Sequence, residues 1–165
     1  MKGNLIHEVT GLLFRYDEGD AKRINHALKV HAFARHIAID EGCDDETLEL
    51  IEIAGLLHDI GIHKAEALYG TSAGKYQEEL GPAVARELLR DLPLAPETLD
   101  RLCYLIANHH HYDKIDGIDY QILVEADFLV NIYEDGMKEE KIRSIREKIF
   151  RTTTGLSVLE CLYGV

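Results

Sequence analysis

Apolar residues recur along this chain at intervals of three and four positions, the spacing that lines one face of an α-helix. Seven stretches show it, at about residues 4–16, 20–41, 45–58, 82–91, 96–110, 118–134 and 138–151. No stretch alternates apolar and polar residues as a half-buried strand does. The pattern therefore predicts an all-α protein.

Aspartates stand at three places where helices are expected to begin. They are Asp20, Asp44 or Asp45, and Asp119. An aspartate just before a helix can accept a hydrogen bond from a backbone N–H of the first turn. We therefore expect these residues to be N-caps.

Two prolines and a glycine-containing segment mark the breaks between helices. Pro82 and Pro96 are expected at the start of helices, where the missing N–H of proline costs little. Residues 61–75 include three glycines and show no sustained periodicity. This segment is expected to be a loop with at most one helical turn.

The chain shows no repeat, low-complexity tract or linker that would divide it. We expect a single domain over residues 1–165, with residues 136–165 as a C-terminal helical extension. Mixed charges followed by apolar residues make this extension amphipathic. Such a segment can cap the bundle or form the face of a homodimer, and the sequence leaves both open.

The charge balance limits the possible partners. The 165 residues include 18 Lys and Arg against 30 Asp and Glu, a formal net charge of −12. Binding to a nucleic acid duplex draws on clustered positive charge, so we expect no duplex partner. An anionic substrate such as a phosphate ester would need a cation in the site. A chain of this length can bury roughly 70% of its unfolded surface, so a metal ion would serve chemistry rather than folding.

Two further features indicate a cytoplasmic protein. Cys43, Cys103 and Cys161 are far apart and form no CxxC pair, which is typical of reduced thiols. The first residues place an acid and a histidine where a signal peptide has its apolar core. No apolar run approaches the ~20 residues that span a bilayer, so we expect no membrane segment.

A histidine and two aspartates fall where a buried core is expected. The dipeptide His58-Asp59 follows the apolar run 50–57, and Asp127 shares a helical stripe with Val130. An unpaired buried carboxylate is costly. A divalent cation bound by His58, Asp59 and Asp127 would satisfy all three. Mixed imidazole and carboxylate ligands suit Mn, Fe, Co, Ni or Zn, with Mg less favoured.

The ordered set His26, His58-Asp59 and Asp127 resembles the signature of the HD superfamily of metal-dependent phosphohydrolases. The resemblance covers about residues 20–135. Its flanking matches are Arg23-Ile24-Asn25-His26, Leu56-Leu57-His58-Asp59-Ile60-Gly61 and Ile106-Ala107-Asn108-His109-His110. It implies a bundle of five or more helices of the HD-domain type, with the metal ion held between helices by His26, His58, Asp59 and Asp127. Periodicity alone does not decide between His26 and His31, and the resemblance favours His26.

The triple His109-His110-His111 ends the helix that begins near Pro96. Members of the superfamily use a histidine in this region either for a second metal ion or to hold the scissile phosphate. The alternative is a solvated helix end, where partly protonated imidazoles complement the helix dipole. We expect a functional role for His109 or His110 more than for His111.

Two departures from the superfamily pattern affect the expected number of metal ions and the expected phosphate-binding residues. Where the two-metal version has a further histidine, this chain has Gln77, followed by Glu78 and Glu79. Glutamine is a poor ligand for transition metals, so we expect one metal ion. A second site that uses Glu78 or Glu79 is the alternative. Ile62 replaces the lysine that often follows the motif.

Three cations remain available for phosphate oxygens, and each could equally be an ordinary surface charge. They are Arg23, Lys64 and Lys75. Nearby tyrosines at 69, 76 and 112 could stack on a substrate ring or simply pack.

The resemblance implies a phosphohydrolase acting on a small phosphate ester, a nucleotide or a related phosphomonoester or diphosphate, through a hydroxide on the metal ion. Asp59 would be both a metal ligand and the general base. His109 or His110 would stabilise the transferring phosphoryl group or protonate the leaving oxygen. The alternatives are a metal-containing binding or regulatory module without turnover and, disfavoured by Gln77, a di-iron oxygenase.

Overall fold

The computed structural model describes residues 2–165, with side chains from residue 5 onward. Over this range it contains nine α-helices, one short 3-10 helix and no strand. The helices are α1 (Lys2–Tyr16), α2 (Ala21–Asp40), α3 (Asp45–Leu57), α4 (Ile62–Tyr69), α5 (Gly74–Leu89), α6 (Pro96–Asn108), η1 (Tyr112–Lys114), α7 (Ile118–Glu134), α8 (Glu139–Lys148) and α9 (Thr153–Tyr163). The predicted all-α class is confirmed.

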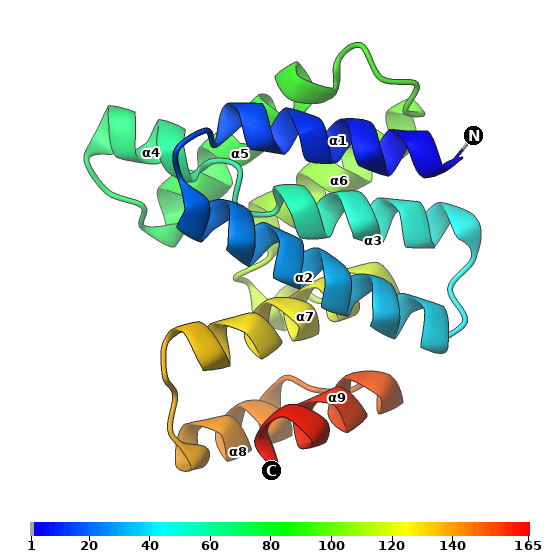
Figure 1. Cartoon of the computed structure of the whole chain (residues 1–165), viewed down its shortest axis with the longest axis vertical. Helices are drawn as coiled ribbons and strands as arrows, with labels where there is room; N and C mark the ends of the chain where they lie inside the picture. The colour runs from blue at the N-terminus through cyan, green and yellow to red at the C-terminus, as the bar shows by residue number, and fades with distance from the viewer. Residues whose placement is uncertain (1) are drawn as a thin grey trace.

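Helix α2 lies in the middle of the bundle and packs against α3 and α7 (Figure 1). Helix α1 covers α3 on one side, while α8 and α9 lie beyond α7 at the opposite end of the molecule. Helices α4, α5 and α6 form the remaining side, where α5 packs on both α4 and α6. The chain thus surrounds α3 and α7 with other helices.

Helices α3 and α7 are the most deeply buried. Helix α3 buries Ile51, Ile53 and Leu57 completely, and α7 does the same with Ile122 and Leu123. A helix that is apolar on nearly all sides has to be covered on nearly all sides. Polar groups at the ends of these helices are therefore drawn into the core.

Two of the predicted caps are confirmed and one is wrong. The Asp20 side chain accepts a hydrogen bond from the Arg23 N–H, and Asp44 caps α3 in the same way. Asp119 does not cap α7, because the N-cap is Gly117. Its carboxylate instead accepts two hydrogen bonds of 2.8 Å from the guanidinium of Arg101.

The segment 61–75 is more helical than predicted. Residues Ile62–Tyr69 form α4, about two turns, which ends at Gly70 with φ 69°. Only Ala65 of this helix is buried. A helix that buries one small residue leaves no apolar periodicity, which is why the pattern indicated a loop.

Pro82 lies inside α5, and the prediction that it starts this helix is wrong. The helix begins at Gly74, and its first turns bury the polar residues Gln77 and Glu78. A polar face turned inward gives no apolar signal. The turn of α5 that contains Gln77 packs closely on Gly61. A Cβ added at Gly61 would lie 2.2 Å from the Gln77 carbonyl oxygen. Pro96, by contrast, starts α6 as predicted.

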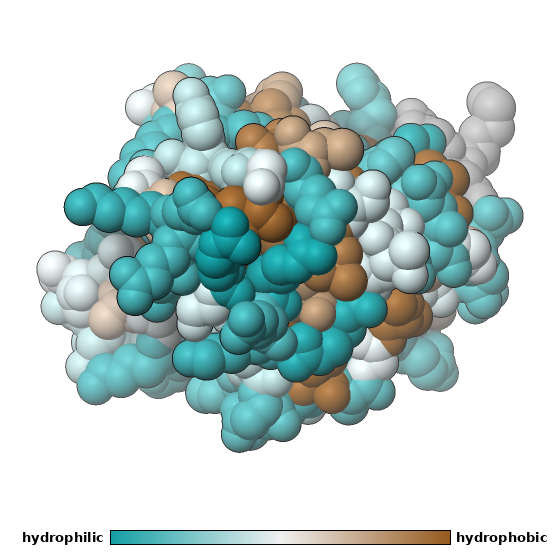
Figure 2. Space-filling view, turned by 90° about the horizontal axis from the view of Figure 1, so that it is seen from below, coloured by the Kyte–Doolittle hydropathy of each residue, from teal (hydrophilic) through white to brown (hydrophobic). Residues whose placement is uncertain are grey.

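The surface adds little about partners. Figure 2 looks onto the end of the molecule formed by α8 and α9 and shows mostly hydrophilic residues, with hydrophobic ones in separate patches. The homodimer therefore stays a prediction. The cysteines at 43, 103 and 161 are free thiols. In the part of the chain that the structure describes, we find no helix with the length and apolar character to cross a bilayer.

Candidate metal centre

Four side chains from three regions of the chain meet where α2, α3 and α7 converge. His26 comes from α2, His58 and Asp59 follow the end of α3, and Asp127 comes from α7. Nε2 of His26 lies 3.1 Å from Nε2 of His58, 3.1 Å from Oδ1 of Asp127 and 3.3 Å from Oδ2 of Asp59. Nε2 of His58 lies 3.3 Å from Oδ2 of Asp59. The four predicted ligands are thus brought together.

Hydrogen bonds on the far side of each ring fix both histidines in one orientation. Nδ1 of His26 lies 2.8 Å from Oε1 of Glu134, and Nδ1 of His58 lies 2.9 Å from the carbonyl oxygen of Gly55. Both partners are acceptors, so each Nδ1 carries the hydrogen in the neutral ring. The Nε2 lone pairs then face the centre, as metal-binding imidazoles require.

The charges in this cluster are strongly coupled. Burial lowers the pKa of His58, but the carboxylates of Asp59 and Asp127 outweigh burial and raise it well above its usual value. Burial raises the pKa of Asp59, but His58 and His109 outweigh it and hold the pKa well below the usual range. His58 likewise outweighs burial and holds the pKa of Asp127 below its usual value. Both carboxylates are therefore ionised at neutral pH and can act as ligands, and a bound cation would displace the proton from His58.

The donor set fits a divalent cation. Ligand atoms about 2.1 Å from one ion lie roughly 3.0–3.4 Å apart, and the distances from the two histidine Nε2 atoms to each other and to the two carboxylates fall in that range. Oδ1 of Asp127 is buried and makes no hydrogen bond of acceptable geometry. His26, His58 and Asp59 also form a group whose ligand atoms lie within 4.8 Å of one another. A cation would satisfy the buried oxygen and neutralise the carboxylates.

A second group of ligand atoms shares Asp59. It consists of Asp59, His109 and His110, again within 4.8 Å of one another. Nε2 of His109 lies 3.3 Å from Oδ1 of Asp59, and it is buried without a hydrogen-bond partner. His109 donates from Nδ1 to the Ile106 carbonyl oxygen at 2.9 Å. His111 lies farther out, with half its side chain exposed. The structure thus brings His109 and His110 to the cluster.

The residues that depart from the superfamily pattern border this second group. Nε2 of Gln77 donates to Oδ1 of Asp59 at 3.2 Å. Glu78 is buried, and its Oε1 lies 3.4 Å from Nδ1 of His110. Glu79 is exposed. Between these two glutamates, only Glu78 could join a second metal site.

Of the three predicted phosphate-binding cations, Arg23 reaches the cluster. It lines a cavity of about 230 Å³ together with His26 and Asp59. Its Nη2 pairs with Glu66 at 3.1 Å, whereas its Nη1 is buried without a partner. The two lysines do not line this cavity.

Lys64 is exposed on α4, and Lys75 lies with its Nζ 4.6 Å from the ring centre of Tyr76. The tyrosines near the site pack on other aromatic rings. Tyr69 stacks on Tyr76, and Tyr112 packs against Phe128.

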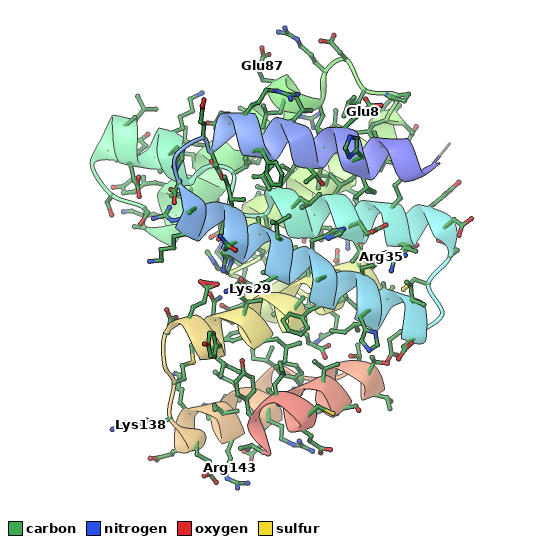
Figure 3. The ribbon with its side chains drawn as sticks, in the orientation of Figure 1. Glu8, Lys29, Arg35, Glu87, Lys138 and Arg143 are labelled. Atoms are coloured by element: carbon green, nitrogen blue, oxygen red, sulfur yellow. The ribbon has the colours of Figure 1, made fainter. Side chains whose placement is uncertain are left out.

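Sequence reasoning missed Asn131 and Glu134, which line the same cavity. They follow Asp127 by four and seven positions, which is one and two turns along the same face of α7. Helical spacing could therefore have identified them. Glu134 also pairs with Lys29, with 3.4 Å between Oε1 and Nζ, and Figure 3 shows Lys29 on the side of α2 that faces α7.

Comparisons with known proteins agree with this geometry. A family model described as "HD domain" matches residues 23–151, a range that includes all four clustered residues. A crystal structure of a predicted HD superfamily hydrolase from an uncultured Thermotogales bacterium has the same fold, with a TM-score of 0.69. The two chains are 24% identical, and the match covers 96% of this chain and 84% of that one.

Proposed function

This chain belongs to the HD-domain family, and on that premise we propose that it is a metal-dependent phosphohydrolase acting on a small phosphate ester. One observation carries the proposal. Two imidazoles whose Nε2 atoms point inward lie within 3.4 Å of two ionised carboxylates, beside a cavity that an arginine also lines. A divalent cation bound there would act as a Lewis acid on a phosphoryl oxygen and would make water a better nucleophile at neutral pH.

Asp59 is suited to two tasks because its two oxygens face different groups. Oδ2 faces the Nε2 atoms of His26 and His58, each at 3.3 Å. Oδ1 faces Nε2 of His109 and accepts a hydrogen bond from Gln77. One oxygen can hold the metal ion while the other accepts a proton from the attacking water.

The remaining groups bind the phosphate and assist the leaving group. The buried Nη1 of Arg23 is a free donor beside the cavity, and a guanidinium is well shaped for phosphate oxygens. His109 and His110 lie on the other side of Asp59. One of these imidazoles can donate a hydrogen bond to the phosphoryl group or a proton to the leaving oxygen.

The test is phosphate release from a panel of nucleotides and p-nitrophenyl phosphate with Mn²⁺, Co²⁺, Ni²⁺ or Mg²⁺. We expect release that requires a metal ion and that falls at least ~100-fold in Asp59→Ala. Asp91→Ala serves as the matched control, because Asp91 is an exposed aspartate outside the site. No release from folded, metal-loaded protein on any substrate would contradict the proposal and favour a binding module.

A further inference from the structure

The cavity beside the metal centre has walls of opposite charge. One wall is the first turn of α2, which contributes Lys22 and Arg23. The facing wall is the last turn of α7, which contributes Asn131, Glu134 and Asp135. The helix dipoles act in the same sense, because an N-terminus is partly positive and a C-terminus partly negative. Such a cavity suits a ligand with an anionic end and a hydrogen-bond donating end.

The α7 wall offers acceptors that the protein itself leaves free. Within residues 5–165, neither the Asn131 amide nor the Asp135 carboxylate makes a hydrogen bond or an ion pair, although both line the cavity. The Asp135 backbone N–H is already used, since it bonds to the Asn131 carbonyl oxygen at 2.8 Å. Oε1 of Glu134 is occupied by His26 and Lys29. The free groups are thus one amide and one carboxylate.

The size and charge of the cavity limit what can enter. Its volume of about 230 Å³ is below the ~300–1,000 Å³ typical of sites for drug-sized ligands. A second or third phosphate on the α7 side of the cavity would lie near Glu134 and Asp135, where like charges repel. A nucleoside triphosphate is therefore disfavoured on both grounds.

Resting on the proposed function, we infer that the substrate is a phosphomonoester of a small alcohol that carries further hydroxyl or amino groups. The phosphate lies between the metal centre and Arg23, and the hydroxyl or amino groups donate to Asn131 and Asp135. An alcohol without such donors would displace water from Asn131 and Asp135 without replacing its hydrogen bonds, which costs affinity.

The experiment compares matched esters on the metal-loaded protein. Glycerol phosphate and ethanolamine phosphate carry donors, propyl phosphate has a similar size without them, and ATP tests the limit on charge. We expect kcat/KM to be about tenfold higher for the donor-bearing esters than for propyl phosphate, the value of one good hydrogen bond to a charged group. Glycerol phosphate offers hydroxyl donors and ethanolamine phosphate offers an ammonium group, so their relative kcat/KM shows which donor the site prefers.

Two variants locate the selectivity. In Asn131→Ala and Asp135→Ala the ratio of kcat/KM between glycerol phosphate and propyl phosphate should fall to within about threefold of unity. The control Asp91→Ala should keep the ratio of the original chain. Equal turnover of the two esters, preference for ATP, or an unchanged ratio in both variants would overturn the inference.

A second measurement distinguishes failure of the proposed phosphohydrolase function from failure of the inferred ligand preference. If no ester is hydrolysed, titration calorimetry with glycerol phosphate and propyl phosphate measures the same preference as affinity. Tighter binding of glycerol phosphate that disappears in Asp135→Ala supports the inference without turnover. Equal binding, or no binding of either ester, overturns it.

Discussion

Helix α7 carries two buried acids two residues apart, and their surroundings are opposite. Glu125 faces the C-terminal helices, where it accepts hydrogen bonds of 2.8 Å from the Thr152 hydroxyl and from the Gln121 amide. Asp127 faces α2 and α3, where its nearest polar atoms are the Nε2 atoms of His26 and His58, at 3.1 and 3.4 Å. Its buried Oδ1 has no hydrogen bond of acceptable geometry.

This difference in polar partners distinguishes Glu125, a structural acid, from Asp127, an acid that can bind a ligand. Burial raises the pKa of Glu125 even though Gln121 and Thr152 donate to it. Burial also raises the pKa of Asp127, but the charge of His58 outweighs burial and lowers it. Glu125 is held by a hydroxyl and an amide, whereas the polar neighbours of Asp127 are two imidazoles, which can release a proton and bind a cation beside it. A buried acid whose polar neighbours are imidazole Nε2 atoms indicates a cation site.

The largest expected effect is on metal binding by Asp127→Asn. Loss of an outer-shell partner costs about 10–100-fold in metal affinity, so loss of a ligand carboxylate should cost more than ~100-fold. Asparagine has the same shape but lacks the charge that lies against His58, so the melting temperature of the protein without added metal should fall as well. Mn²⁺ titration calorimetry measures the affinity, with Glu125→Gln as the matched control that keeps it. Equal Mn²⁺ affinity in Asp127→Asn and the original chain would contradict the assignment of Asp127 as a metal ligand.

Glu125→Ala should affect folding instead of metal binding. It removes the acceptor for the Thr152 hydroxyl and the Gln121 amide, so we expect a loss of about 2–4 kcal/mol in the free energy of unfolding. Urea denaturation measures this loss, and Mn²⁺ affinity should stay unchanged. A stable variant with weakened Mn²⁺ binding would reverse the roles assigned to the two acids.

Gly155→Ala tests the packing around Glu125 from α9, the helix that faces it. A Cβ at Gly155 would lie 2.1 Å from Oε1 of Glu125, so the carboxylate or α9 must move. We expect destabilisation by about 1–3 kcal/mol, as for other overpacked sites. Gly11→Ala in α1 is the matched control, because the nearest atom to its added Cβ is 3.6 Å away. Equal denaturation midpoints for the two variants would contradict the tight fit.

The smallest effect is the pH dependence that Glu125 introduces. Its pKa in the folded protein is raised above 4.5, so the folded state holds this proton more tightly than the unfolded chain does. Its contribution to stability is fully present below about pH 4.5 and is lost as the pH rises through the folded pKa. Relative to Glu125→Gln, the original chain should therefore lose stability as the pH rises from 4 to 8. Urea denaturation of both proteins checks this, and an original chain that gains stability relative to Glu125→Gln as the pH rises would contradict it.

How far the sequence predicts this molecule depends on which side chains face inward. The apolar run before His58-Asp59 and the stripe around Asp127 predicted a buried acid and its helix, because apolar periodicity records burial directly. The early start of α5 escaped prediction, because its buried turn carries Gln77 and Glu78. Polar residues on a buried face look like surface residues in a sequence.

The rest of the site depends on long-range geometry. The sequence offers His26 and His31 as equal candidates, but His31 lies 3.1 Å from Glu52 between α2 and α3, away from the cluster. One donor to Glu125, Gln121, lies one turn before it on α7, but the other, Thr152, precedes α9 far along the chain. The sequence near Glu125 therefore gives only part of what distinguishes it from Asp127. Helical spacing alone would have identified Glu134 as a neighbour of the site.

The most direct test of the central claim is anomalous diffraction from crystals grown with Mn²⁺, measured near the manganese absorption edge. We predict an anomalous peak bounded by the Nε2 atoms of His26 and His58 and by the carboxylates of Asp59 and Asp127. Crystals of Asp127→Asn grown in the same way should lack the peak. A peak elsewhere, or none between these four side chains at saturating Mn²⁺, would contradict the assignment of this cluster as the metal centre.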